Sequence, residues 1–262
     1  MAIKSVSELE RAAFQIRKNL LKLCSIQKIH IGGDLSIADV MTVLWQYQMK
    51  YDPNNINDEK RDRFVLSKGH ASAVTSFNQA AIGCFSAEDV INEYATDEGR
   101  FSMHSCNLVN PYVEVSTGSL GHGFPVACGM AAALRLKENY QSRVYVVMGD
   151  GESVRRFHLG SCYECCSLSL RESCSYYRFQ WVRGRMGTLK EITGLGNIAD
   201  KYHAFGWNVI EINGNDISEI KNAFDSLPDS KSEIPSVLVC HTIKWQGCPI
   251  YGKIKFFGMQ VR

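Results

Sequence analysis

The sequence lacks the long apolar runs that mark membrane proteins and secreted precursors. No stretch approaches the roughly 18 apolar residues of a transmembrane helix, and the first residues do not contain the apolar core of a signal peptide. An excess of one charge is also missing, because 29 basic residues are balanced by 27 acidic ones and the net charge is +2. We therefore expect a cytoplasmic protein without a broad attraction to nucleic acid or to a membrane surface.

Internal repeats and linker segments are absent as well. The 262 residues, of which 45% are hydrophobic and 21% charged, are typical of one globular domain over residues 1–262. Ten cysteines are many, but disulfides are a poor expectation for a cytoplasmic chain. Four of them, Cys162, Cys165, Cys166 and Cys174, lie close together without the second spaced pair typical of a zinc site.

Hydrophobic periodicity predicts strands that alternate with helices. Strands are expected over residues 63–66, 144–148, 207–212 and 236–240. Helices are expected over residues 7–24, from an N-cap at Ser36 onward, and over residues 71–84, 86–95, 124–137, 198–205 and 217–227. This alternation predicts an α/β fold, a doubly wound and mostly parallel sheet with helices on both faces. Ligands bind such sheets at the carboxyl ends of the strands.

A single carboxylate follows the apolar strand over residues 144–148. Asp150 stands there between Gly149 and Gly151, and two glycines allow backbone N–H groups to approach a phosphate. Such a carboxylate suits Mg²⁺ or Ca²⁺ shared with a diphosphate. Gly-Asp-Gly alone is also a common turn, so its interpretation depends on the other motifs.

Four further motifs accompany Gly-Asp-Gly. They are His30-Ile-Gly-Gly33, Leu66-Ser-Lys-Gly-His70, His104 and Glu114-Val-Ser-Thr-Gly-Ser-Leu-Gly-His-Gly123. Taken singly, His30 reads as a loop residue and His70 as a helix cap. Taken together, and in this order, the motifs between about Arg11 and Glu152 resemble the amino-terminal, thiamine diphosphate-binding half of transketolases, and the resemblance resumes near Leu189.

The resemblance implies an enzyme that uses thiamine diphosphate and a divalent cation (Mg²⁺, or Ca²⁺ or Mn²⁺). Such enzymes transfer a two-carbon ketol unit between sugar phosphates, and the cofactor holds the electrons left by carbon–carbon cleavage. By position, Asp150 corresponds to the metal ligand, and His30 and His104 to catalytic histidines that line the substrate funnel. The implied cofactor-binding residues are His70, Gly118, Ser119, Leu120, Gly149 and Gly151.

The resemblance also implies a partner. In this family the glutamate that activates the aminopyrimidine belongs to a second domain, before which this chain ends. We therefore expect the partner to be a C-terminal transketolase subunit, in a heterotetramer, with sugar phosphates as substrates. Two alternatives stay open: another thiamine diphosphate enzyme (a deoxyxylulose-phosphate synthase or a keto-acid dehydrogenase component), and a non-catalytic relic.

Two segments, residues 153–188 and 245–262, depart from the family pattern. The first has neither a helical nor a strand period, and a displacement of the reading frame by one nucleotide would restore the expected helix and buried strand. We hypothesise compensated frameshifts in both segments. The family's second metal ligand, an asparagine, would fall at Gln180 and Trp181, a later histidine is missing, and Asn213-Gly-Asn-Asp216 replaces Asp-Gly-His-Asp. We therefore expect weak metal binding, loss of a central strand and reduced or no activity.

Overall fold

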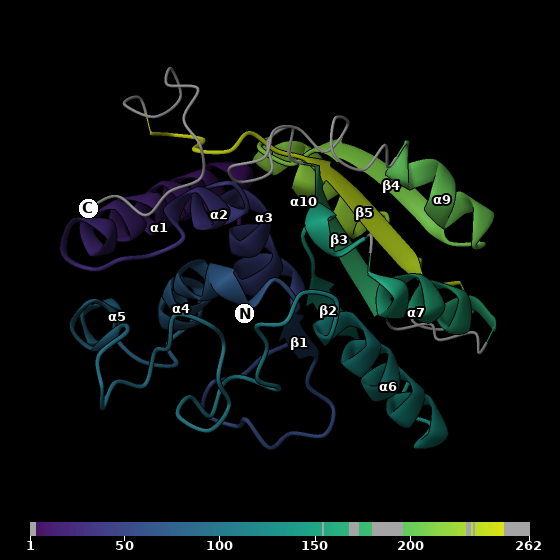
Figure 1. Ribbon diagram of the computed structural model, residues 1–262, viewed down its shortest axis with the longest axis horizontal. Helices are drawn as coiled ribbons and strands as arrows, with labels where there is room; N and C mark the ends of the chain where they lie inside the picture. The colour runs from purple at the N-terminus through teal and green to yellow at the C-terminus, as the bar shows by residue number, and fades with distance from the viewer. Residues whose placement is uncertain are drawn as a thin grey trace.

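The chain forms three layers, a parallel β-sheet between two groups of helices (Figure 1). The computed structural model describes residues 4–153, 155–167, 173–179, 196–228, 232 and 234–248. Its strands are β1 (Arg63–Leu66), β2 (Val144–Val147), β3 (Ser173–Phe179), β4 (Asn208–Asn213) and β5 (Ser236–His241). They are hydrogen-bonded in the order β1-β2-β3-β5-β4, and every neighbouring pair is parallel.

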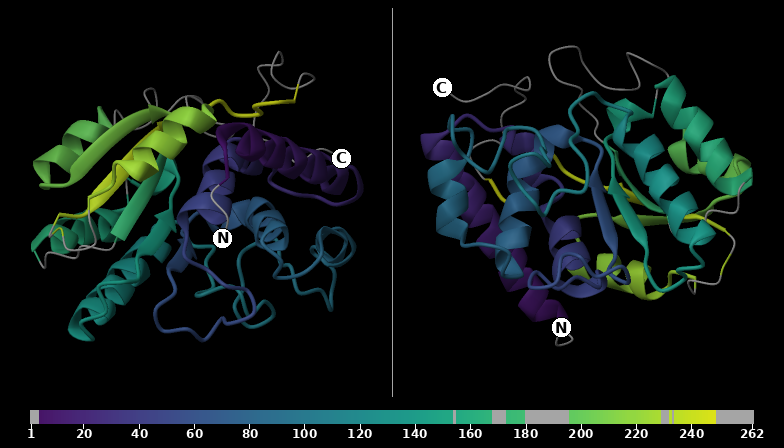
Figure 2. Two further views of the ribbon diagram at one scale, coloured as in Figure 1. Left: turned by 180° about the vertical axis from the view of Figure 1, so that it is seen from behind. Right: turned by 90° about the horizontal axis from the view of Figure 1, so that it is seen from below.

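Helices cover both faces of the sheet, as Figures 1 and 2 show. One face carries α1 (Val6–Ile26), α2 (Ile31–Leu35), α3 (Ala38–Val43), the π-helical turn η1 (Leu44–Gln48), α4 (Ser72–Ala81), α5 (Ala87–Glu93) and α10 (Ile217–Asp225). The other carries α6 (Gly123–Leu136), α7 (Arg156–Ser167) and α9 (Ile198–Ala204). Two 3₁₀ turns, η2 (Gly69–Ala71) and η3 (Asp150–Glu152), follow β1 and β2. The expected doubly wound α/β fold is thus confirmed.

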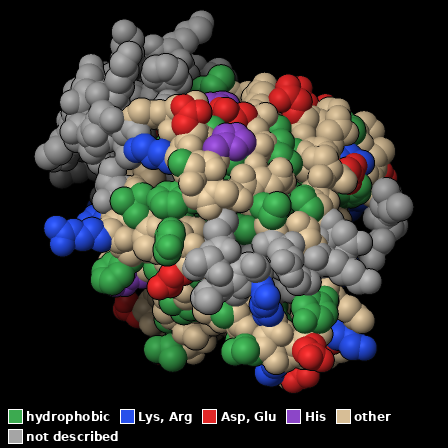
Figure 3. Space-filling view, turned by 90° about the vertical axis from the view of Figure 1, so that its right-hand side faces the viewer, with side chains coloured by type: hydrophobic (Ala, Val, Ile, Leu, Met, Phe, Trp, Pro, Cys, Tyr) green, Lys and Arg blue, Asp and Glu red, His purple; other side chains and the backbone are tan. Residues whose placement is uncertain are grey.

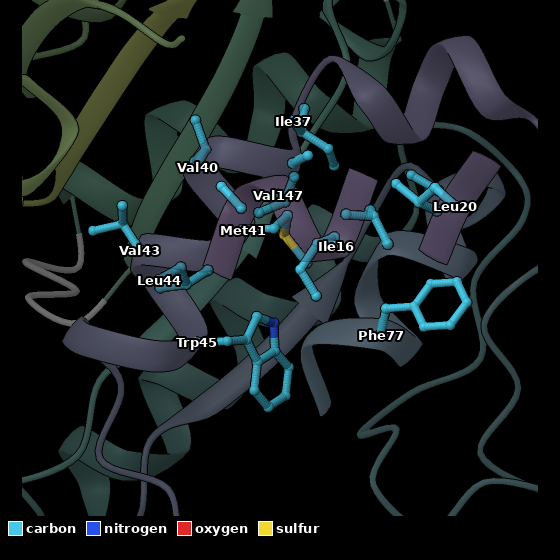
Figure 4. Packing of buried hydrophobic residues seen from close by; sticks show 14 of the residues in the cluster. Ile16, Leu20, Ile37, Val40, Met41, Val43, Leu44, Trp45, Phe77 and Val147 are labelled. Atoms are coloured by element: carbon cyan, nitrogen blue, oxygen red, sulfur yellow. The ribbon is translucent and has the colours of Figure 1, made fainter. Parts of the chain in front are cut away.

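Strands β1, β2, β4 and β5 contribute side chains to two separate hydrophobic cores. In β2, Tyr145 and Val147 face the layer of α1, α3 and α4, whereas Val144 and Val146 face the layer of α6, α7 and α9. This alternation follows from the two-residue period of a strand, and it buries all four residues of β2. Figure 4 shows the first core, where Trp45 and the side chains of α1, α3 and α4 pack together.

Local sequence signals account for several helices. The buried residues of α1 recur at helical spacing, and Ser5 and Glu8 form a capping box at its start. The capping box expected at Ser86 and Asp89 is present at the start of α5, where each side chain accepts a hydrogen bond from the other residue's backbone N–H at 3.0 Å. These elements were therefore predictable from neighbouring residues alone.

The segment around Ser36 differs from the expectation. Ser36 is not an N-cap, because its hydroxyl donates to the carbonyl oxygen of Gly33 at 2.7 Å, at the end of α2. Residues 30–33, where His30 suggested a loop, are the start of α2, and the helix expected from Ser36 onward is divided into α3 and η1. Gly32 is buried and helical although glycine has a low helix propensity. Close packing against buried neighbours therefore explains why this glycine-containing segment is a helix.

The expected loss of a central strand is wrong. Strand β3 lies between β2 and β5 and is paired with both, although its segment lacks a strand period. A central strand of a doubly covered sheet is held by its backbone and does not need polar and apolar side chains in alternation. Helix α7 also forms within residues 153–188, and it buries Cys162 and Cys165. The frameshift hypothesis stays a prediction, and residues 168–172, 180–195 and 249–262 lie outside the described part of the chain.

The described surface carries mixed charge. On the face shown in Figure 3, acidic and basic side chains are interspersed among hydrophobic and polar ones. Among the helices that the structure describes, none combines the length and the apolar character that crossing a bilayer requires.

Candidate functional site

The loops that follow β1 and β2 lie side by side at one edge of the sheet. Leu66 pairs with Val147 at the ends of the two strands, and the backbone N–H of Ser67 donates to the carbonyl oxygen of Val147 at 2.9 Å. Beyond the strands, a Cβ built on Gly149 would lie 3.9 Å from the Cβ of Lys68. The His70 loop and the Asp150 loop are therefore neighbours, as parallel strand pairing requires.

Glu152 joins these loops to a third segment. Its Oε1 accepts hydrogen bonds from the hydroxyl of Ser67 at 2.6 Å and from the backbone N–H of Gly121 at 2.8 Å, and its Oε2 accepts one from the backbone N–H of Gly149 at 2.8 Å. The side chain is fully buried. Burial raises the pKa of Glu152, while these hydrogen bonds and the charge of Lys68 act in the opposite direction.

Sequence reasoning assigned no role to Glu152. The available signal was a third acidic position directly behind Gly-Asp-Gly, within the first turn after a buried strand. A charged residue in that place needs partners, because an unpaired carboxylate is rarely fully buried. The identity of those partners could not be read from the sequence, since two of them lie 31 and 85 residues away.

The three predicted histidines from separate segments form one cluster. The ring of His30 lies 5.4 Å from the ring of His70 and 5.8 Å from that of His104, measured between centroids. Glycine at position 33 permits this approach, because a Cβ there would lie 3.2 Å from Cδ2 of His70. Burial, and secondarily the neighbouring His104, lowers the pKa of His30. His30 is thus neutral near pH 7 and can accept a proton.

The predicted aminopyrimidine loop begins beside this cluster. A Cβ built on Gly118 would lie 3.7 Å from Cδ2 of His104, and Gly118 and Ser119 are exposed residues, while Leu120 is half-buried. The hydroxyl of Thr117 donates to the carbonyl oxygen of Leu66 at 2.6 Å. The loop is therefore attached to the end of β1 but is exposed at Gly118 and Ser119.

Asp150 is the first residue of η3 and is buried. Its Oδ1 accepts a hydrogen bond from the N–H of Gly151 at 2.8 Å. Within the described ranges, no three His, Cys, Asp or Glu side chains are grouped to hold a metal. A cation at Asp150 would therefore need oxygen atoms of a diphosphate or of water. Positions 180 and 181, where the family pattern places its second metal ligand, and the end of the chain, where it places a later histidine, lie outside the described residues.

The turn Asn213–Asp216 has structural roles. Asp216 is the N-cap of α10, where its Oδ1 accepts from the N–H of Ser218 at 2.8 Å. The side-chain amide of Asn215 donates to Asp39 at 3.0 Å. These residues also line a hollow of about 340 Å³ with Arg17. Because Arg17, Asp39 and Asn215 are hydrogen-bonded to one another or to backbone, we assign no ligand to this hollow.

Comparisons with known proteins agree with this geometry. Residues 19–259 match the family model of the transketolase thiamine diphosphate-binding domain. The chain is 35% identical over 249 residues to one of the subunits of the apulose-4-phosphate transketolase of Phocaeicola vulgatus, covering 92% of this chain and 85% of that protein. It is 32% identical over 264 residues to the 6-deoxy-6-sulfo-D-fructose transketolase subunit SqwG of a Clostridium species, covering 97% of this chain and 92% of that protein.

A solved structure extends the comparison to the whole fold. The transketolase of Campylobacter jejuni superimposes with a TM-score of 0.85 at 26% identity, covering 95% of this chain. This chain spans 40% of the length of that transketolase. The chain belongs to the transketolase family and corresponds to its amino-terminal, thiamine diphosphate-binding domain.

Proposed function

We propose that the chain is the amino-terminal subunit of a two-chain transketolase, which moves a two-carbon ketol unit between sugar phosphates. The observation that carries the proposal is the convergence of His30, His70 and His104 beside the Asp150 loop at one edge of the sheet. These residues come from distant segments, and a structural role for each would not require them to meet.

The residues present fit thiamine diphosphate and a divalent cation. Gly118 and Ser119 are exposed, Gly149 and Gly151 carry no side chain that would keep a phosphate away from the loop, and Asp150 offers a carboxylate. We assign the cofactor contacts to His70, Gly118, Ser119, Leu120, Gly149 and Gly151, and the contact with Mg²⁺ (or Ca²⁺ or Mn²⁺) to Asp150. When bound, the cofactor supplies an electron sink for carbon–carbon cleavage.

The histidines act on the sugar. His30, kept neutral by its lowered pKa, can take a proton from a substrate hydroxyl, and the exposed His104 beside it can bind or relay that proton. His70, in the turn η2 that follows β1, lies 5.4 Å from His30 between ring centroids. His30 and His104 thus carry the proposed proton transfer, and His70 is kept for the cofactor.

A partner chain completes the enzyme in this proposal. It supplies the glutamate that activates the aminopyrimidine, within a cytoplasmic heterotetramer, so that this chain alone does not turn over. Two relatives are subunits of transketolases named for apulose 4-phosphate and for 6-deoxy-6-sulfo-D-fructose. Together with pentose phosphates, these sugars are the first substrates to test.

Calorimetry tests cofactor binding directly. The chain, assembled with a C-terminal transketolase subunit from the same genome, is titrated with thiamine diphosphate in the presence of Mg²⁺. We expect saturable heat that Asp150→Asn weakens by about tenfold or more, because a carboxylate ligand of the cation is lost. His203→Gln, a change at an exposed position on α9, is the matched control and should bind as the wild type does. Heat near zero for the wild-type complex would contradict the proposal and favour a non-catalytic relic.

Ketol transfer tests the catalytic role of the histidines. The complex is assayed with the three sugar classes, and with pyruvate plus glyceraldehyde phosphate to detect a deoxyxylulose-phosphate synthase. His30→Ala should lower kcat by roughly 10²- to 10⁴-fold, the range of general acid–base catalysis. The activity of His203→Ala should be unchanged. Equal kcat values for His30→Ala and the wild type would remove His30 from the mechanism.

Nucleotide resequencing tests the frameshift hypothesis for residues 153–188 and 245–262. Compensating single-nucleotide displacements at the borders of these segments are the expected result. If the gene encodes the present residues in frame without error, the hypothesis is wrong, and any activity of the complex then belongs to this sequence as it stands.

A further inference from the structure

Three segments of the site meet at the carboxylate of Glu152. Ser67 follows β1, Gly149 follows β2, and Gly121 precedes α6, and each donates one hydrogen bond of 2.6 to 2.8 Å to this side chain. The last two donors are backbone N–H groups, so that the contact fixes main-chain positions as well as side chains. One buried carboxylate thereby joins three segments that are far apart in the sequence.

The segment before α6 is built to reach this carboxylate. Gly121 has a φ of +92°, a conformation that favours glycine, and it directs its N–H toward Oε1. Gly123 lies so close to β1 that a Cβ would be 2.6 Å from Cα of Ser67. Both glycines bring the end of the exposed loop at Gly118 and Ser119 against the buried glutamate.

A second attachment of the same loop does not involve Glu152. The hydroxyl of Thr117 donates to the carbonyl oxygen of Leu66 and ties the start of the loop to the end of β1. Glu152 extends the connection to Gly149, next to Asp150. The distance between the Asp150 loop and the exposed Gly118 loop therefore depends on this side chain.

We infer that Glu152 is a positioning residue that sets the Asp150 loop and the Gly118 loop at the spacing needed to bind the two ends of one cofactor. The inference rests on the proposed function for the identity of that cofactor. Glu152 does not touch the cofactor in this scheme, and it acts through the backbone of Gly121 and Gly149.

The chemistry of the site predicts that glutamine cannot replace Glu152. Both carboxylate oxygens accept hydrogen bonds, whereas a glutamine has one accepting oxygen and an NH₂ group that only donates. In Glu152→Gln at least one donor would face another donor. Aspartate is shorter by one methylene and would not reach all three donors. Glu152→Gln thus keeps the shape of the side chain but not its charge, and Glu152→Asp keeps the charge but not the length.

Amide hydrogen exchange of the full chain, without cofactor, tests the positioning role. In Glu152→Gln we expect exchange about tenfold faster at Gly121 and Gly149, as follows from losing a hydrogen bond to a charged group, with unchanged exchange in β4 and β5. The matched control is Glu59→Gln, because the side chain of Glu59 is 84% exposed. A merely structural role would accelerate exchange throughout the sheet.

Cofactor titration of the assembled complex gives the second readout. Glu152→Gln should raise the apparent Kd of thiamine diphosphate by about tenfold, while the KM for sugar phosphate is unchanged and kcat recovers at saturating cofactor. Unchanged exchange at both glycines, or an unchanged Kd, would overturn the inference. If the wild-type complex binds no thiamine diphosphate, the proposed function fails, and the exchange result still decides whether Glu152 holds the three segments together.

Discussion

Protonation of His158 should destabilise the folded chain in mild acid. His158 lies in α7, within the segment that departs from the family pattern, and only 1% of its surface is exposed. Its Nε2 lies 2.9 Å from the hydroxyl of Tyr202 on α9 and 3.4 Å from the sulfur of Cys162, and its ring packs against Phe124 of α6. The imidazole is thus part of the core beneath the second helical layer.

The magnitude follows from the pKa of His158. Burial lowers this pKa from 6.5 to about 4. The unfolded chain therefore takes up the proton near pH 6.5, and the folded chain only near pH 4. The stability that neutral His158 contributes is present above about pH 6.5 and is lost as the pH falls toward 4. The full difference is roughly 3 kcal/mol, of which about 2 kcal/mol is lost between about pH 7.5 and 5.

Urea unfolding at several pH values measures this contribution. The free energy of unfolding of the wild type should fall more steeply toward pH 5 than that of His158→Gln, by about 2 kcal/mol. The comparison uses the slope, so a lower absolute stability of the variant does not obscure it. His203→Gln, at an exposed position of α9, should keep the wild-type slope.

An NMR titration of the imidazole resonances gives an independent measurement on the folded chain. A resonance that titrates near pH 4 and disappears in His158→Gln is expected. Equal slopes for the wild type and His158→Gln, together with a resonance that titrates near pH 6.5, would refute the reasoning. Helix α7 would then not be packed as described, and residues 155–167 would not contribute side chains to the hydrophobic core.

Three further changes test individual contacts of the fold by urea unfolding. Gly69→Ala should destabilise the chain by about 1–3 kcal/mol, because the added Cβ would lie 2.7 Å from the carbonyl oxygen of Thr117. Gly118→Ala is the control: its Cβ makes only ordinary contacts, so the free energy of unfolding should be nearly unchanged. Ser86→Ala removes the cap of α5 and should cost about 1 kcal/mol, so an unchanged midpoint would contradict the capping geometry. Asp62→Asn places an NH₂ group against the N–H of Lys50 or of Arg143 and should cost about 1.5–3 kcal/mol, and a neutral result would show that those 2.7 Å hydrogen bonds are not formed.

The sequence predicted most elements because their signals are local. Helix α1 and strand β2 follow the periods of helix and strand, and the cap at Ser86 needs only Asp89 three residues later. The order of strands and helices then indicated a parallel sheet, and a parallel sheet places the ends of β1 and β2 at one edge. For the same reason the sequence indicated that His70 and Asp150 belong to one site.

Other features could not be read from neighbouring residues. The glycine-rich start of α2 contradicts local propensity and is held by close packing. The segment of β3 lacks a strand period, and the strand is held by backbone pairing with β2 and β5. Local preferences amount to a few tenths of a kcal/mol per residue, which burial in a packed core readily exceeds.

The sequence by itself determined most of the elements, the fold class and the candidate chemistry of His30, His70, His104 and Asp150, because those properties depend on residue type, spacing and order. Only the tertiary structure decided that the three imidazoles meet, each within 6 Å of the next in the order His70–His30–His104, and that Glu152 joins three loops. The physical reason is that hydrogen bonds and ring contacts act over a few ångströms in space. Their partners, up to 85 residues apart in the chain, are chosen by the packing of the whole sheet and its helices.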